Sequence, residues 1–214
     1  MALDFRFRRA SLSTASLCAL AVAVAACSGG GGKSASTSTT RSGTAVTIAA
    51  GPVTIAASGA AATLSDADRT AVVDTVRRYV TAASIDPLQG RPVGELAVVF
   101  TPSATTQVKG PDRAAMLDDE LPKATGKVTA TATPLAMTAL SDPTGAIVLV
   151  GVNLDLHLRA AAAKGPVDVK RTGALVLAKD GDSWKIASFR VTVDRTGAGL
   201  PPTAASTSTT ASRP

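Results

Sequence analysis

A strict alternation of apolar and polar side chains between Ala146 and Arg159 constrains the fold more than any other feature of the sequence. Successive side chains of a β-strand point to opposite faces of the sheet, so this pattern predicts one long strand with one buried face. The predicted buried face carries Val148, Val150, Val152, Leu154, Leu156 and Leu158, and the opposite face carries Gly151, Asn153, Asp155, His157 and Arg159.

The segments around this strand share its period of two. Residues 125–140, 167–179 and 183–195 read as strands, and turn signals such as Asp180-Gly181-Asp182 separate them. Four consecutive strands with short turns predict an antiparallel meander. In the last strand the apolar phase slips between Ile186 and Phe189, which predicts a bulge or a sharp bend.

The chain ahead of the strands has helical features. Ser65 is a helix cap, and two aspartates follow it at the positive end of the helix dipole. Apolar residues at helical spacing then predict one helix to about Ser84, with Val72, Val76, Tyr79, Val80 and Ala83 on its packed face. Two short helices are expected at 94–100 and 112–120, after turn-forming prolines and glycines.

This order of elements, ending in Asp180-Gly181-Asp182-Ser183-Trp184-Lys185-Ile186, resembles the NTF2-like (cystatin-like) superfamily over about residues 65–195. The resemblance implies an α+β domain, at 63–195, in which a long N-terminal helix and two short helices pack on a curved four-stranded antiparallel sheet shaped like a cone. The same element order occurs in membrane-tethered accessory proteins of actinobacterial lipid importers. The alanine, threonine, glycine and arginine bias also resembles coding from a high-GC actinobacterial genome.

Residues 1–26 have the three zones of an export signal: basic residues, a polar stretch, and an apolar run from Leu17 to Ala26. Such a run is too short to cross a bilayer, which takes about 20 residues in a helix, and it fits the apolar region of a signal peptide. Arg8-Arg9 leaves the twin-arginine route open, although Ser11 favours the general secretory route.

The apolar run ends in Val24-Ala25-Ala26-Cys27, which resembles the lipobox of bacterial lipoproteins. Small residues there let a peptidase reach the bond before the cysteine, and the thiol takes a diacylglyceryl group as a thioether. The resemblance implies that the mature chain starts at Cys27 and is held by acyl chains, such as palmitate, on the extracytoplasmic face of the cell membrane. The alternative is an ordinary cleaved signal followed by an incidental cysteine.

The two ends of the mature chain are poor in large apolar residues. We expect residues 27–62 to be a flexible linker and residues 196–214 to be a disordered, hydroxyl-rich tail, open to glycosylation. Val-Thr-Ile-Ala-Ala occurs at 46–50 and again at 53–57, either as an edge or partner-binding strand or, as we favour, as a low-complexity duplication. Ser-Thr-Ser-Thr-Thr likewise occurs at 36–40 and 206–210.

Composition argues against several classes of function. The formal net charge is +6, but the basic residues do not cluster, so we expect no nucleic-acid partner. The chain has one histidine, and both of its cysteines, Cys18 and Cys27, lie in the export segment, which leaves little to bind zinc. Asp118, Asp119 and Glu120 would spread around a helix axis, so we expect no calcium site, and no cofactor motif is present.

The polar row Asn153, Asp155, His157 and Arg159 on the long strand is the one candidate for catalysis. An Asp–His pair can supply a general base and its orienting partner, and NTF2-like dehydratases and isomerases use such residues inside the cone. The row lies opposite the apolar face, however, and should therefore meet solvent. We predict no catalytic residue.

These observations predict a lipid-anchored, non-catalytic binding or accessory module whose partner is an envelope protein, a lipid or a wall polymer. The alternative is a carrier or sensor that holds an apolar ligand in the cone. Its inner face would be lined around Val150, Leu154, Val176 and Val191. A third interpretation is an NTF2-like lyase or isomerase.

Overall fold

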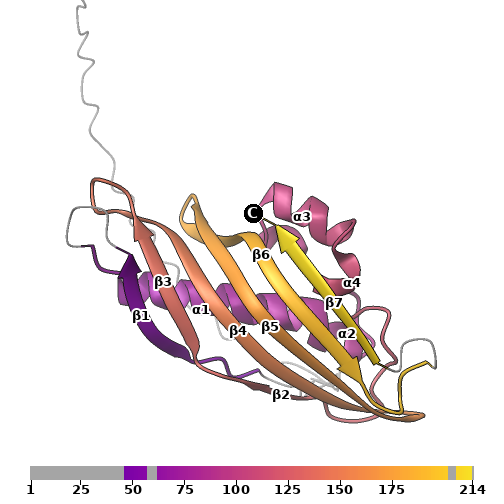
Figure 1. Cartoon of the computed structure of the whole chain (residues 1–214). Helices are drawn as coiled ribbons and strands as arrows, with labels where there is room; N and C mark the ends of the chain where they lie inside the picture. The colour runs from indigo at the N-terminus through magenta and orange to yellow at the C-terminus, as the bar shows by residue number, and fades with distance from the viewer. Residues whose placement is uncertain (1–45, 57–61, 202–205, 214) are drawn as a thin grey trace, which may run out of the picture. The chain divides into compact units, whose positions relative to one another are not determined.

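The structure is a computed structural model in which residues 46–56, 62–201 and 206–213 are described (Figure 1). Its helical elements are α1 (Asp66–Val80), the π-helical turn η1 (Thr81–Ile85), α2 (Asp86–Leu88), the 3₁₀ turn η2 (Leu96–Val98), α3 (Pro102–Lys109) and α4 (Arg113–Met116). Its strands are β1 (Ala50–Ala56), β2 (Thr129–Ala132), β3 (Leu135–Ser141), β4 (Ile147–Ala162), β5 (Gly165–Asp180), β6 (Ser183–Thr196) and β7 (Ser206–Arg213).

The described strands form one mixed sheet of seven strands in the order β1-β3-β4-β5-β6-β7, with β2 also paired to β4. β1 runs parallel to β3, and the other pairs are antiparallel. The fold class that the resemblance implied is therefore wrong: the chain does not pack a long N-terminal helix and two short helices on a cone-shaped, four-stranded antiparallel NTF2-like sheet. The central meander of long strands is present, but the sheet extends beyond it on both sides.

The added strands have identifiable causes. β1 and β7 arise from segments that we expected to be a flexible linker and a disordered tail, so that expectation is wrong for Ala50–Ala56 and Ser206–Arg213. Backbone pairing with β3 and β6 orders these stretches although their side chains are small. The segment predicted as one strand over 125–140 is divided at Thr133-Pro134 into β2 and β3, because proline cannot donate to the ladder.

The helices differ from the prediction in extent. Ser65 does cap α1, with its Oγ accepting a hydrogen bond of 3.1 Å from the backbone N–H of Asp68. Only η2 and α4 form within the two predicted short helices, and α4 ends at Met116 because Leu117 is extended. α3 was not predicted at all; it begins after Thr101, whose hydroxyl accepts from the N–H of Ala104.

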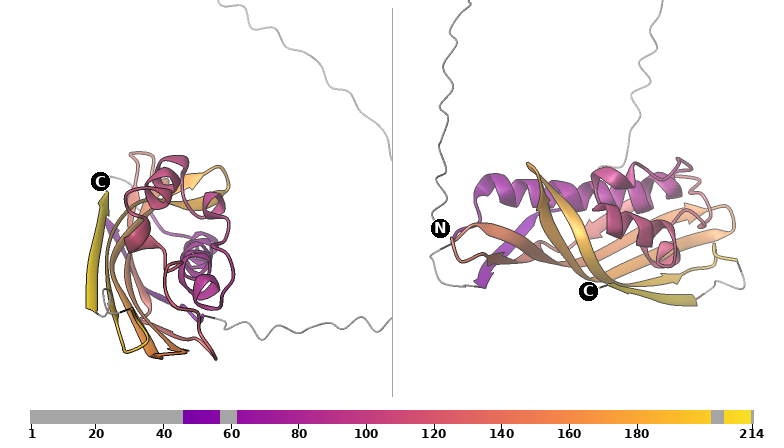
Figure 2. Two further views of the ribbon diagram at one scale, coloured as in Figure 1. Left: turned by 90° about the vertical axis from the view of Figure 1, so that its right-hand side faces the viewer. Right: turned by 90° about the horizontal axis from the view of Figure 1, so that it is seen from above.

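Among the described residues, the helices lie on one face of the sheet and none covers the other, as the left view of Figure 2 shows. We call these the packed face and the open face. The predicted alternation is confirmed from Val150 to Leu158, where every second side chain is buried. Val148 departs from it and is 39% exposed, since it is the extra residue of a bulge between the pairs Leu140–Leu149 and Ser141–Ile147.

Aromatic side chains pack between α1 and the packed face. Tyr79, Phe100 and Phe189 are each at most 1% exposed, and their rings meet edge to face at centroid distances of 5.5 and 6.4 Å. Val176, which we expected to line an inner cavity, instead lies on the open face, paired with Gly151 and Ser188. In the described part of the chain no helix is long and apolar enough to cross a membrane.

The predicted irregularity in the last strand is confirmed. β6 bulges at Ala187, between the pairs Val176–Ser188 and Leu177–Ile186. Just before the bulge, Trp184 is 2% exposed and its Nε1 donates to Oδ1 of Asp68 on α1 at 2.9 Å. The hydroxyl of Thr75 also donates to the Trp184 carbonyl at 3.0 Å, so this tryptophan fastens β6 to α1.

Candidate functional site

The polar row predicted on β4 lies on the open face, and its members are exposed. Nε2 of His157 and Nε of Arg159 lie 3.4 and 3.7 Å from Oδ1 of Asp168 on β5, with the two basic side chains 55% and 64% exposed. The structure therefore brings His157 and Arg159 to Asp168 and not to Asp155. These are solvated surface pairs, and they lack the burial that would tune a general base.

The lipobox residues Val24, Ala25, Ala26 and the predicted lipidation residue Cys27 lie outside the described residues. Within the described residues, no group of histidines, cysteines and carboxylates is arranged to hold a metal ion.

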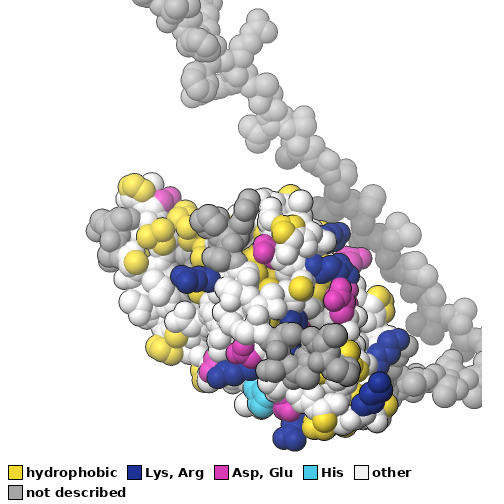
Figure 3. Space-filling model, turned by 45° about the vertical axis from the view of Figure 1, so that its right-hand side comes forward, with side chains coloured by type: hydrophobic (Ala, Val, Ile, Leu, Met, Phe, Trp, Pro, Cys, Tyr) yellow, Lys and Arg dark blue, Asp and Glu magenta, His cyan; other side chains and the backbone are white. Residues whose placement is uncertain are grey.

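The open face is divided along its length. One half carries mostly small or apolar side chains, namely Leu140, Leu149, Ala174, Val176 and Ala178, of which Leu140 is 42% exposed. Two basic residues, Arg190 and Lys185, pair with Ala174 and Ala178 in this half. The other half carries charged side chains of both signs, namely Asp155, His157, Arg159, Asp168, Lys170 and Asp194, among rows of threonines. Figure 3 shows hydrophobic side chains gathered at the upper left of the molecule, and the histidine among charged side chains at the bottom.

A second cluster, of four residues, lies on the packed face and is buried. Arg171 of β5 and Arg195 of β6 sit on neighbouring strands, and they face Asp118 in the segment after α4 and Tyr79 on α1. Arg171 is 0%, Asp118 1% and Arg195 7% exposed. We call these residues the Arg–Asp–Arg cluster. Charged groups are rarely buried so deeply unless they are paired.

Hydrogen bonds within the cluster are dense. Nη2 of Arg171 donates to Oδ2 of Asp118 at 2.7 Å, and Nη1 donates to the Tyr79 hydroxyl at 3.0 Å and to the Ala115 carbonyl at 2.8 Å. Nε and Nη2 of Arg195 donate to Oδ1 of Asp118 at 3.1 and 2.8 Å. Asp118 is thus held by two guanidinium groups, one on each oxygen.

The two arginines also complete the end of a helix. Nη2 of Arg195 donates to the carbonyls of Ala114 and Leu117 at 2.7 and 3.1 Å. Nη1 of Arg171 donates to the carbonyl of Ala115, which lies between them in the sequence. The last carbonyls of a helix have no partner inside it, and the negative end of the helix favours cations. The cluster therefore fixes α4 and the segment after it on the sheet.

The electrostatics of the cluster follow from burial and pairing. Burial by itself raises the pKa of Asp118, but the charges of Arg171 and Arg195 and their hydrogen bonds outweigh it, so the pKa lies below its ordinary value. Burial raises the pKa of the Tyr79 hydroxyl, which stays neutral. The cluster thus holds two guanidinium cations against one carboxylate, a net charge of one positive unit in the interior.

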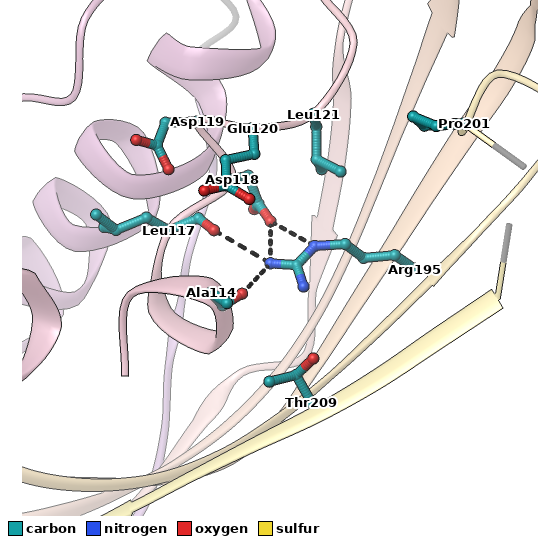
Figure 4. A pocket seen from close by; sticks show the side chains of 9 residues that line it. All are labelled: Ala114, Leu117, Asp118, Asp119, Glu120, Leu121, Arg195, Pro201 and Thr209. Carbon is teal, nitrogen blue, oxygen red and sulfur yellow. Dashed lines mark hydrogen bonds and ion pairs between the residues drawn. The ribbon is translucent and has the colours of Figure 1, made fainter. Parts of the chain in front are cut away.

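A pocket of about 300 Å³ opens beside this cluster, between the segment after α4 and the strands β6 and β7 (Figure 4). Its lining residues are Ala114, Leu117, Asp118, Asp119, Glu120, Leu121, Arg195, Pro201 and Thr209. Asp119 is paired with Arg113, and Glu120 is exposed. Figure 4 shows the third nitrogen of Arg195, Nη1, directed away from Asp118 on the side of Thr209.

No match to the chain was found among protein-family models, curated proteins or solved structures.

Sequence reasoning missed the Arg–Asp–Arg cluster, although a signal was present. Arg171 shares its parity with the buried Val169 and Leu175, and Arg195 shares its parity with Val191 and Val193. A basic residue in phase with the buried face of a strand predicts a buried charge that needs a partner. The sequence did not identify Asp118 as the partner, because we expected Asp118 to lie within a helix over 112–120, whereas α4 ends at Met116.

Proposed function

We propose that this protein is a lipid-anchored, non-catalytic binding module of the cell envelope, and that it binds a partner protein through the open face of its sheet. The observation that carries the proposal is that, in the described part of the chain, helices cover one face of the sheet and leave the other uncovered (Figure 2). An uncovered sheet face of this kind can bury its apolar half against a partner, and its charged half can orient that partner.

The anchor is supported by the sequence alone. Val24-Ala25-Ala26 directly before Cys27, at the end of a short apolar run, is the arrangement that lipidation and cleavage require. Acyl chains on Cys27 would hold the chain at the membrane surface.

The packed interior favours a binding module over a carrier or an enzyme. A ligand held inside a cone would need a cavity between α1 and the sheet, whereas Tyr79, Phe100 and Phe189 pack edge to face there. An enzyme needs groups tuned by burial next to a substrate, whereas the carboxylate and the histidine of the polar row are exposed on the open face.

The charges of the open face favour a protein partner over an anionic lipid surface. Asp155, Asp168 and Asp194 balance Arg159, Lys170 and Arg190, which are on the same face. An anionic bilayer attracts clusters of basic residues, and a balanced set gives little net attraction. Alternating charges beside an apolar patch instead suit a protein surface of complementary pattern.

The binding surface is tested with two variants that make the same change of charge. Asp155→Lys places a lysine on the open face, and Glu95→Lys places one on the helical side. Membranes holding the full chain are solubilised in mild detergent and resolved by native electrophoresis. We expect wild type and Glu95→Lys to migrate in a complex larger than the monomer, and Asp155→Lys to migrate as the monomer. A monomer in all three samples would overturn the proposal.

The anchor is tested with Cys27→Ala. We expect this variant to lose incorporation of labelled palmitate and to remain uncleaved by the lipoprotein peptidase, while the wild-type chain is labelled and found in membranes. Unchanged labelling and membrane retention in Cys27→Ala would contradict lipidation at this residue.

A further inference from the structure

We propose that the pocket beside Arg195 is a binding site for a small ligand with a single carboxylate group. This site is on the packed side of the sheet, apart from the open face, and the proposal does not depend on the partner or the anchor. It rests on a fixed arginine with an unused donor, on the charge of the buried cluster, and on the shape of the pocket.

The donor is the Nη1 group of Arg195. The hydrogen bonds that Arg195 makes with the described residues use Nε and Nη2, and none of these residues accepts a hydrogen bond from Nη1. Figure 4 shows this nitrogen pointing out of the cluster, on the side of Thr209. The other two nitrogens are fixed by Asp118 and by two backbone carbonyls, so Nη1 is held in place before any ligand arrives.

The charge of the cluster calls for an anion. Arg171 and Arg195 bring two positive charges into the interior, and Asp118 returns one negative charge. A buried charge without a counterpart is unfavourable, and an anion at Nη1 would supply the missing one. A carboxylate oxygen accepting from a guanidinium forms one of the stronger hydrogen bonds found in proteins.

The walls of the pocket select the rest of the ligand. Ala114, Leu117, Leu121 and Pro201 give it apolar sides, and the hydroxyl of Thr209 adds a polar group. A volume of about 300 Å³ is at the lower end of the range for small-molecule sites. The pocket therefore suits a short apolar chain ending in a carboxylate.

Glu120 sets a limit on the charge of the ligand. Its carboxylate lines the same pocket and offsets part of the attraction that Arg195 exerts on an anion, while the cost of removing an ion from water rises steeply with its charge. Asp119 also lines the pocket, but its negative charge is already balanced by an ion pair with Arg113. We therefore expect a monoanion to bind and a phosphate dianion to bind more weakly.

The test is thermal unfolding of the full chain in detergent, followed by the fluorescence of Trp184, with sodium butyrate added. A ligand that binds only the folded state raises the unfolding temperature in a saturable way. We expect butyrate to do so, and equal concentrations of sodium chloride, n-butylammonium chloride and sodium phosphate to give smaller, unsaturable shifts. No saturable shift with butyrate, or an equal one with phosphate, would overturn the proposal.

Variants then locate the site. Glu120→Gln removes the opposing charge from an exposed side chain outside the hydrogen-bonded cluster, and should lower the butyrate concentration at half-saturation by about two- to fivefold. Glu95→Gln, the matched control, should leave it unchanged. Arg195→Lys should abolish the butyrate effect. That variant also loses bonds to Asp118, so if it does not fold, the comparison of Glu120→Gln with Glu95→Gln decides, and equal half-saturation in the two would refute the site.

Discussion

At the scale of single residues, Asp118 matters because it is the one anion that separates two buried cations. Removing one partner of a buried ion pair leaves an uncompensated charge, which costs about 3–5 kcal/mol. Asp118→Asn should therefore lower the free energy of unfolding by about that amount, measured by urea denaturation of the full chain with Trp184 fluorescence. A loss below about 1 kcal/mol would show that the two arginines are satisfied by backbone carbonyls alone.

The same residue gives stability a dependence on pH. The pKa of Asp118 is lower in the folded chain than in the unfolded chain, so its contribution is complete above the unfolded pKa of about 4. It is lost as the pH falls through the lower folded value. We expect wild type to lose stability below about pH 4 more steeply than Asp118→Asn does, since other carboxylates titrate in both. Parallel curves would contradict this.

Gly173 is required by the close approach of two strands. Its φ is +151°, and a Cβ added there would lie 2.0 Å from the backbone oxygen of Arg190 on β6. Gly173→Ala should therefore cost at least about 2 kcal/mol of stability, because backbone and not a flexible side chain must move. Gly126→Ala is the control, with no atom within 4 Å of its added Cβ, and should change stability by less than about 0.5 kcal/mol.

Within single elements, β4 shows the clearest division of side chains. Its apolar side chains lie on the packed face of the sheet and its polar side chains lie on the open face. Leu154 is 2% exposed on the packed face, and its neighbour Asp155 is exposed on the open face. Leu154→Asp would bury an unpaired charge and should prevent folding, whereas Asp155→Leu should change stability by at most about 1 kcal/mol. Circular dichroism and urea denaturation of the two full-length variants check this, and equal losses would mean that the faces are reversed.

β1 owes its position to Gly51, which distinguishes the two copies of Val-Thr-Ile-Ala-Ala. A Cβ at Gly51 would lie 2.7 Å from the backbone oxygen of Leu135, and the Gly51 carbonyl accepts from Arg69 at 2.7 Å. Seven residues earlier, the first copy is preceded by Thr44, whose side chain would meet this obstacle in a shifted register. The duplication alone is therefore compatible with two registers of β1 on β3, and Gly51 selects the observed one.

Substituting this glycine should release the strand. In Gly51→Val we expect the β3 amides that bond to β1 to exchange hydrogen faster, because β1 can no longer approach Leu135. The control Thr54→Val, on the open face of the same strand, should keep the exchange slow. Unchanged protection of β3 in Gly51→Val would show that β1 does not depend on the close approach.

At the scale of the whole molecule, the parts that could be predicted are those with a strong local period. The alternation of β4, the cap at Ser65 and the phase slip before Phe189 each have a local physical cause, and each is present. β1 and β7 could not be predicted, because their small side chains carry little pattern and their order comes from backbone pairing with distant strands. The Arg–Asp–Arg cluster was missed for a similar reason, since it joins residues far apart in sequence.

The open face of the sheet is the surface through which we propose that this chain binds a partner protein. The most direct test places a photocrosslinking amino acid at Thr172, on the open face, or at Lys109 on the helical side, in the full chain in intact cells. We expect a crosslinked product of one discrete mass from position 172, lost when Asp155→Lys is added, and none from position 109. The same products from both positions, or none from position 172, would contradict it.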